Sequence, residues 1–430
     1  MPLLPPNHPE RFVLAEEVHA RPPVPVETPS RASYVAILVD ADDRERERQH
    51  LATLCERHAV PAPAPGATQF SAKLGALRIK WERHGEFSGY TFFAKGPGAA
   101  PFADNAASLL PGGWLAGVPG VTMAAVHAAV LVLEGDVPDP TALSEHFDGN
   151  IVVGSELADG AGMMCTDFKI HDDRFARVLL LDRHFTPRQA GRMLQRIFEI
   201  EAYRMMALLA LPVARRQSPR ILAIERSLAT LTDSIAREEH DVADSDEALL
   251  QQLTRLAAEV ESGLAASQFR FGACRAYFEL VTTRIGELRE QRLPGMQTIE
   301  EFMARRFTPA VATCTTVSQR LHDLSERVAQ ASGLLSTRVD IARERQNQSL
   351  LASMDRRAKL QLRLQQTVEG LSVAAIVYYT AGLVGYLAKG LKAGGAPVNA
   401  DLVVALAIPV LVVVVVGAVR RARKRVAVGD

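Results

Sequence analysis

Two stretches near the carboxyl end decide the architecture of this chain: LSVAAIVYYTAGLVGYLA (371–388) and LVVALAIPVLVVVVVGAV (402–419). Each has 18 residues, and neither contains a charged one. An α-helix of that length is about 27 Å long, close to the thickness of the hydrocarbon core of a bilayer. The alternative is a pair of buried core segments, but side chains that are apolar on every face of a helix favour lipid. The sequence therefore predicts a C-terminal two-helix transmembrane hairpin over residues 370–420.

The charges beside these stretches predict how the hairpin crosses the membrane. Cationic residues precede the first stretch at Arg356, Arg357, Lys359 and Arg363 and follow the second at Arg420, Arg421, Arg423, Lys424 and Arg425. The loop between the stretches holds only Lys389 and Lys392. Because lysine and arginine are enriched on the cytoplasmic side, we expect a multi-pass protein with both termini in the cytoplasm. The cations around the basic tail (421–430) are expected to contact anionic lipid headgroups rather than nucleic acid.

The composition of the remaining chain is typical of a globular protein in a reducing compartment. Its 430 residues suggest two or three domains, and 49 Lys plus Arg balance 49 Asp plus Glu, which leaves no overall positive charge for nucleic acid. The four cysteines are far apart and form no CxxC pair, so neither a disulfide framework nor a zinc site is expected. The first residues, MPLLPPNHPERF, do not match a signal peptide, and we expect everything up to about Gly370 to stay in the cytosol.

An α+β cytoplasmic domain with a mixed sheet is predicted for residues 31–185. Before it, the proline density of residues 1–30 disfavours regular helix and predicts an extended strap. Residue patterning and turn signals place the elements of the domain. The predicted strands are 34–39, 72–83, 86–94, 121–133, 150–156, 162–170 and 175–182, and the predicted helices are 42–58 and 141–147.

A long helical, coiled-coil stalk is predicted for residues 186–369. Thr186 and Pro187 form an N-cap and first-turn pair for a helix that should end before Pro212. Two apolar seams have the alternating spacing of three and four residues that is typical of coiled coils: Ile221, Ile224, Leu228, Leu231, Ile235 and Val317, Leu321, Leu324, Val328, Ala331, Leu335. These seams predict self-association through the stalk helices.

Helix breaks are expected at three places in the stalk: near Gly263, at Pro294-Gly295, and as a kink at Pro309. No helix breaker occurs between residues 310 and 388. One helix is therefore expected to run from the stalk through the first membrane span.

Motifs for catalysis or cofactor binding are absent from the sequence. It contains no phosphate loop, dinucleotide fingerprint, H-E-x-x-H, EF-hand or G-x-S-x-G pattern, so we predict no catalytic residue and no cofactor. His19 and Arg21 could bind an anion as a buried pair, but hydrogen bonds that fix the strap to the domain are the favoured interpretation. Asp167, His171, Asp172 and Asp173 could gather a cation, and a solvated hairpin tip is favoured over that.

The first predicted span offers a second candidate site for a cation. Glu369 lies just before it, and Ser372, Tyr379 and Thr380 lie inside it. In an oligomer with this helix at its centre, Glu369 would form an acidic ring at the cytoplasmic mouth of a pore. The alternative is a single interfacial carboxylate that pairs with Arg363 or Lys359.

Three segments carry a resemblance to a known family: HPERFVLAEEVHARPP (8–23), DRHFTPRQAGRMLQRIFEIEAYRMMALLALPVAR (182–215) and LQQTVEGLSVAAIVYYTAGLVGY (364–386). With them, the chain resembles the bacterial family known as domain of unknown function 3422. The resemblance implies a membrane-anchored protein of the bacterial inner membrane, and it implies no activity.

In architecture the chain is also similar to the CorA-type magnesium transporters, which are pentamers. That similarity implies a homo-oligomer with a central stalk and a divalent cation as a candidate partner. The chain departs from those transporters because Gly-Tyr-Leu-Ala-Lys (385–389) replaces their Gly-Met-Asn signature and the outer loop is cationic. We expect a membrane-anchored regulatory, binding or scaffold protein; the alternative is a CorA-like divalent-cation channel gated through the stalk, and an enzyme is the weakest hypothesis.

Overall fold

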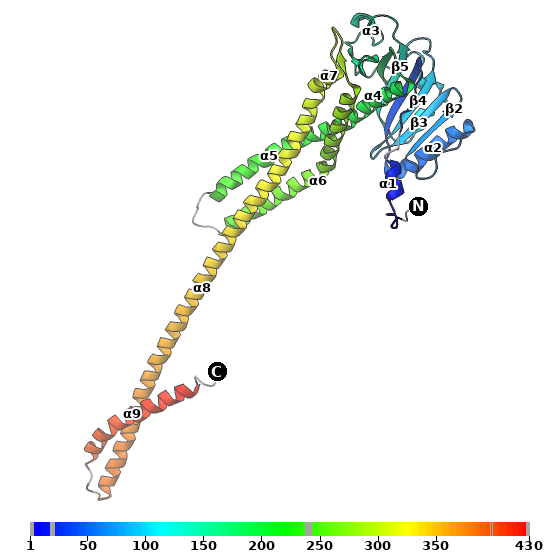
Figure 1. Ribbon diagram of the computed structural model, residues 1–430. Helices are drawn as coiled ribbons and strands as arrows, with labels where there is room; N and C mark the ends of the chain where they lie inside the picture. The colour runs from blue at the N-terminus through cyan, green and yellow to red at the C-terminus, as the bar shows by residue number, and fades with distance from the viewer. Residues whose placement is uncertain (1–3, 18–21, 237–242, 396, 398, 427–430) are drawn as a thin grey trace. The chain divides into compact units, whose positions relative to one another are not determined.

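The computed structural model describes residues 4–17, 22–236, 243–395, 397 and 399–426 (Figure 1). The chain divides into two units, Met1–Glu238 with Gln251–Ser332 and Glu239–Leu250 with Gly333–Asp430. The first unit contains the sheet and most of the helices, and the second contains the later part of the longest helix together with the C-terminal helix.

A mixed sheet of nine strands runs through the first unit in the described part of the chain. Its strands are β1 (Ser30–Leu38), β2 (Gln69–Leu74), β3 (Leu77–Arg83), β4 (Phe87–Lys95), β5 (Val121–Val132), β6 (Val153–Leu157), β7 (Gly162–Thr166), β8 (Ala176–Asp182) and β9 (Gln291–Arg292). Their order is β2-β3-β4-β1-β5-β8-β7-β6-β9, and all neighbours are antiparallel except β5 and β8. The predicted mixed sheet is confirmed.

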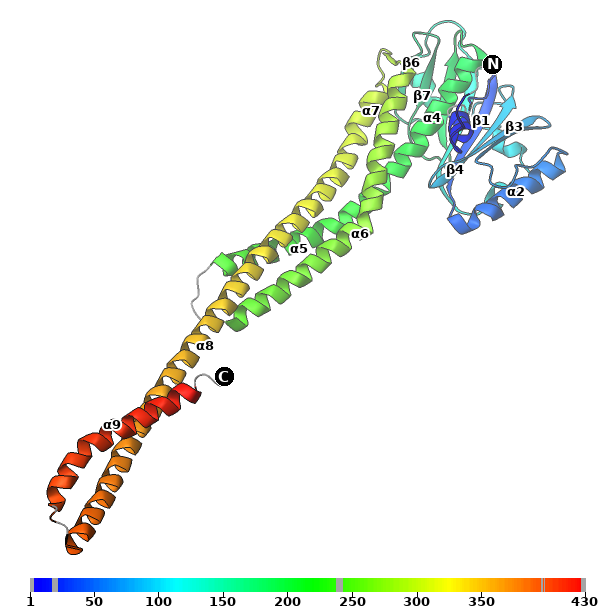
Figure 2. The same ribbon diagram turned by 60° about the horizontal axis from the view of Figure 1, so that its bottom comes forward.

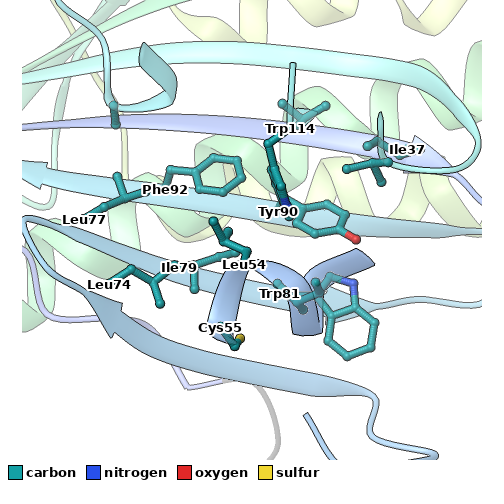
Figure 3. Packing of buried hydrophobic residues seen from close by; sticks show 14 of the residues in the cluster. Ile37, Leu54, Cys55, Leu74, Leu77, Ile79, Trp81, Tyr90, Phe92 and Trp114 are labelled. Atoms are coloured by element: carbon teal, nitrogen blue, oxygen red, sulfur yellow. The ribbon is translucent and has the colours of Figure 1, made fainter. Parts of the chain in front are cut away.

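Helix α2 (Arg44–Arg57) covers the core on one face of the sheet, where its Leu54 packs in the same cluster as Phe92 (Figure 3). The carboxylate of Glu47 is fully buried beside this cluster. It accepts hydrogen bonds from Trp81 Nε1 (3.0 Å) and Tyr90 Oη (2.8 Å). A buried charge is costly unless it is hydrogen-bonded, so these two aromatic side chains both fill the core and hold the carboxylate.

Helix α4 (Pro187–Leu208) lies across the opposite face of the sheet (Figure 2). Thr186 and Gln189 form a capping box at its start, in agreement with the predicted N-terminus. Tyr34 of β1 stacks on Phe198 of α4 with the ring centroids 5.1 Å apart. The sheet therefore has a helix on each face, and short helix α3 (Pro140–Glu145) follows β5.

The proline-rich leader differs from the predicted continuous strap. Residues 11–17 form helix α1 (Arg11–Glu17), which no proline interrupts. The strap description holds only for the segment just before β1, which crosses the start of α4. There Val26 N donates to Pro187 O (2.9 Å), and a Cβ at Gly191 would lie 1.9 Å from Val24 O. Glycine is therefore required at position 191 for this backbone contact.

Helices α5 (Ala210–Ala236), α6 (Ala243–Leu288) and α8 (Thr308–Ala393) pack together within the first unit. Arg320 of α8 pairs with Glu225 of α5 (2.6 Å), and Ser325 of α8 donates to Glu261 of α6 (2.6 Å). The side chains of both predicted seams are buried, apart from half-buried Ile235. The seams thus pack within one chain.

The helix ends in this bundle correct three predictions. The first break comes at Leu209, so Pro212 lies in the opening turn of α5, where proline is tolerated. Helix α6 continues through Gly263, where the missing side chain admits Gln217 of α5 close to the backbone. In place of the expected kink at Pro309, the helix is interrupted at Phe307, between α7 (Ile299–Arg306) and α8.

The second unit consists of the start of α6, residues 333–393 of α8, and α9 (Ala400–Val426). Arg338 of α8 pairs with Asp246 of α6 (3.2 Å). Helix α9 runs back beside the end of α8 (Figure 2). There a Cβ at Gly385 would lie 3.3 Å from a methyl carbon of Val404. Most other side chains of this unit's part of α8 are exposed.

Candidate functional site

Two helices are long and apolar enough to cross a membrane among the described residues. The most apolar 18-residue window in the helix that ends at Ala393 has a mean hydropathy of 1.6, and the window in α9 reaches 3.2. Only 6% of the first window and 0% of the second are buried. Core helices of soluble proteins of this composition are mostly buried, so this exposure agrees with the predicted spans at 371–388 and 402–419.

The predicted pore residues follow one stripe of α8. Glu369, Ser372, Tyr379 and Thr380 are three, seven and one residue apart, so they fall on neighbouring positions of a helical surface. Tyr379 is exposed, while the hydroxyl groups of Ser372 and Thr380 donate to the carbonyl oxygens of Val368 and Ile376 of the same helix. Lys359, one expected partner of Glu369, pairs instead with Asp355 (2.6 Å).

The other predicted contact residues are only partly described. Arg420 and Arg421 are exposed near the end of α9. Arg423, Lys424 and Arg425 continue this helix, but their side chains lie outside the described part, as do His19 and Arg21 altogether.

The sequence suggests a solvated tip for the hairpin between β7 and β8, but only two of its four polar residues, Asp172 and Asp173, are exposed. Asp167 and His171 are buried, and His171 Nε2 lies 3.0 Å from Asp167 Oδ2 and its Nδ1 lies 2.7 Å from Asp148 Oδ2. Hydrogen bonds from His171 and then Arg177 lower the pKa of Asp148. Among the described residues no group of three or more His, Cys, Asp or Glu side chains could hold a metal ion. The contacts of His171 with Asp167 and Asp148 join the hairpin to the segment after α3.

A second buried histidine contacts β1 from β5. Ser33 Oγ lies 2.9 Å from His127 Nδ1, and His127 Nε2 lies 3.8 Å from Asp173 Oδ2. The three residue types are those of a hydrolytic triad, but Ser33 is 0% exposed and also accepts a hydrogen bond from Ala107 N. No substrate can reach such a hydroxyl, so this chain of contacts ties β1, β5 and the hairpin together.

A pocket that the sequence analysis missed lies where the leader crosses the end of the sheet. Its volume is about 650 Å³, within the range of small-molecule sites. The leader supplies Val24 to Glu27, and Pro187 of α4 lies beside them. On the sheet side its walls include Lys73 of β2, Arg78 of β3, Phe93 and Lys95 of β4. We refer to this site as the leader pocket.

The strand register explains why several cationic side chains line the leader pocket. Lys73 lies directly opposite Arg78, and Arg78 lies directly opposite Phe93, so all three belong to the same face of the sheet as Tyr34. The turn between β2 and β3 makes this register possible, because Gly75 has a φ of +66° at the first turn position, as hairpins of this kind require. Lys95 follows Phe93 by two residues and therefore shares its face.

The charges of the leader pocket are not balanced. Lys95 pairs with Glu27 (2.5 Å), and this contact lowers the pKa of the Glu27 carboxyl. Lys73 and Arg78 are both exposed, and neither has an ion-pair partner among the described residues. The pocket can therefore supply two free cations above a floor that includes the ring of Phe93.

The mixed sheet, the helical bundle and the two apolar helices define the class: an α+β protein with a long helical region and two helices suited to a membrane. The chain belongs to the family described as Protein of unknown function (DUF3422), whose sequence profile matches residues 6–426. No curated protein and no solved structure matches the chain.

Proposed function

We propose that the protein is a homo-oligomeric, membrane-anchored binding or regulatory protein of the bacterial inner membrane. In this proposal the end of α8 and most of α9 form a transmembrane hairpin. The sheet and the bundle lie in the cytoplasm, and the cationic end of α9, from Arg420 to Arg425, contacts lipid headgroups. The observation that carries the proposal is the exposure of two uncharged apolar stretches, 371–388 and 402–419, whereas the two apolar clusters at the sheet are buried.

Flanking charge supports the orientation. Arg356 to Arg363 before the first stretch and Arg420 to Arg425 after the second are rich in cations, whereas the connection has two lysines. The positive-inside tendency places both flanks in the cytoplasm.

Self-association is supported by α8 rather than by the predicted seams, which are already buried within one chain. Over residues 350–368, before the first stretch, α8 exposes seven large apolar side chains: Leu350, Leu351, Met354, Leu360, Leu362, Leu364 and Val368. Five charged residues lie among them, so this part of the helix suits water and a helical partner better than lipid. A second copy of α8 would cover the same residues symmetrically.

Cysteine labelling in intact spheroplasts tests the orientation, because all four native cysteines are buried and should react slowly with a membrane-impermeant maleimide. Gly394→Cys, in the connection, should be labelled from outside. Asn347→Cys, on the exposed surface of α8, should be labelled only after the membrane is permeabilised. The opposite pattern would reverse the orientation, and labelling of both sites without permeabilisation would refute the hairpin.

A divalent-cation channel gated through α8 is the second candidate. The stripe of Glu369, Ser372 and Tyr379 on one side of α8 supports it, since these groups would line a pore in an oligomer. The cationic connection argues against an acidic lure for metal ions. Divalent-cation flux into liposomes that contain the full chain, with Glu369→Ala as the matched variant, separates the candidates. Flux that depends on Glu369 supports the channel, and absence of flux for several ions removes it.

A further inference from the structure

The leader pocket combines three features that a site for a small anion needs. It has a volume of about 650 Å³, one wall of apolar side chains from the leader, and one wall with an excess of positive charge. Its carboxylate, Glu27, is already engaged by Lys95. Lys73 and Arg78 are left without an anionic partner, although each faces the other across the β2–β3 pair.

The placement of Lys73 opposite Arg78 destabilises the sheet. Like charges directly opposite each other in an antiparallel pair are destabilising, and opposite charges would be stabilising. On the same face, Lys80 of β3 pairs with Glu82 of its own strand (2.9 Å), whereas Lys73 and Arg78 have no opposite charge beside them in the described part of the chain. An anion placed between Lys73 and Arg78 would convert the repulsion into two charge-assisted contacts.

The geometry of the remaining walls indicates what the anion carries. Arginine forms paired hydrogen bonds with phosphate or carboxylate oxygens, and lysine adds a compact charge. Beside these groups lie Phe93 and the apolar residues Val24, Pro25 and Val26, which offer an apolar surface to the rest of a ligand. Because Gly191 holds the leader directly against α4, this wall is formed before any ligand arrives.

We propose that the leader pocket binds a small molecule that carries phosphate groups, with Lys73 and Arg78 as the residues that contact them. A group with at least two negative charges matches the two free cations. The apolar wall accommodates an organic body, so an organic phosphate should bind more tightly than the inorganic ion.

Isothermal titration of the full chain in a neutral detergent tests the proposal with three probes: inorganic pyrophosphate, ADP and dioctanoyl phosphatidic acid. At least one should bind saturably. The combined variant Lys73→Ala/Arg78→Ala should weaken that binding at least about tenfold, since two contacts to a charged group are lost. The relative affinities of the probes distinguish a free phosphate, an organic phosphate and a lipid headgroup.

Arg305→Ala/Arg306→Ala is the matched control, because it also removes two exposed cations that have no ion-pair partner among the described residues. This variant should bind the probes as the unaltered chain does. The proposal is overturned if none of the probes binds saturably, or if binding survives in the Lys73/Arg78 variant or falls equally in both. All substituted residues are exposed, and an unchanged unfolding midpoint verifies that each variant is folded.

Discussion

Large apolar side chains have opposite surroundings in the two units. In the first unit Trp81 and Phe92 are 0% exposed and lie in a cluster with α2. In the second unit Tyr378 and Val413 are 76% and 72% exposed. All four are hydrophobic residues, so the difference lies in what covers them. Each unit must remove its apolar surface from water, at about 25 cal/mol per Å². The first does so with its own chain, and we propose that the second does so with lipid or another copy.

The second unit itself contains two kinds of exposed surface. From Leu350 to Val368 the apolar residues of α8 are accompanied by five charged residues, whereas residues 371–388 and 402–419 contain no charged residue. A helix with a polar side suits a protein partner in water, and a helix that is apolar on all sides suits hydrocarbon. The comparison therefore separates three environments along one chain: core, proposed interface and proposed bilayer.

The largest effect is expected from a variant that disrupts the proposed transmembrane segment of α9. Val410→Arg/Val414→Arg places two charges on one side of α9, at residues that are both exposed. Each arginine costs about 2.5–3.5 kcal/mol at the centre of a span, so together they cost about 6 kcal/mol of insertion free energy. We expect the chain to be lost from the carbonate-washed membrane fraction, as measured by immunoblot.

Leu350→Arg/Met354→Arg is the control for that experiment, because these residues are also four apart and exposed. It should leave the membrane fraction unchanged and reduce the oligomer measured by native mass. Equal membrane loss in both variants would mean that general misfolding explains the result.

The next prediction contrasts the core with the exposed part of α8. Trp81→Ala creates a cavity in the sheet core and leaves the Glu47 carboxylate without one of its donors. We expect a loss of about 3–5 kcal/mol in the free energy of unfolding of the sheet domain. Leu351→Ala should change it by less than about 0.5 kcal/mol. Chemical unfolding followed by far-UV circular dichroism measures both, and a small effect at Trp81 would contradict the described core.

A third prediction uses pH to test the first unit alone. Burial lowers the pKa of His127 from 6.5 to about 4, with Asp173 opposing the shift and Arg177 adding to it. Above pH 6.5 the unfolded and folded states are both neutral at this residue. As the pH falls from 6.5 to 4, only the unfolded state binds the proton, so about 3 kcal/mol of stability is lost across that range.

Tryptophan fluorescence measures this loss in the sheet domain specifically, because both tryptophans of the chain, Trp81 and Trp114, belong to its core. His127→Asn, which keeps a polar group near Ser33, should flatten the pH dependence. A slope that persists in this variant would assign the pH dependence to other groups.

Much of this fold could be predicted because its signals are local. Uncharged windows, strand patterning and the Thr186-Pro187 start each depend on neighbouring residues. Periodicity also predicted that Leu228 and Leu324 are buried, but it cannot say which helix covers them. That choice depends on the bundle formed by distant segments of the chain. The two-residue strand β9 is held by its pairing with β6, which leaves no pattern of its own in the sequence.

The leader pocket could not be predicted from the sequence for a similar reason. Lys73, Arg78 and Lys95 are ordinary surface residues in the sequence, and only the strand register brings them to one face. One signal was available. In AKLGALRIK (72–80) the Gly-Ala pair has glycine at the first position of a two-residue turn, which splits the predicted strand 72–83 and sets Lys73 opposite Arg78.

The smallest expected change in stability tests whether Lys73 stabilises the sheet or binds a ligand. Lys73→Glu places opposite charges across β2 and β3, so pairing with Arg78 should raise the stability of the domain by about 0.2–1 kcal/mol. The same change removes a cation from the leader pocket and should abolish binding of the phosphate probe that the unaltered chain binds. Tryptophan fluorescence unfolding and titration on one sample measure both. Higher stability with lost binding means that the native charge arrangement serves an anion at the expense of the strand pair, whereas lower stability with unchanged binding assigns Lys73 to the sheet.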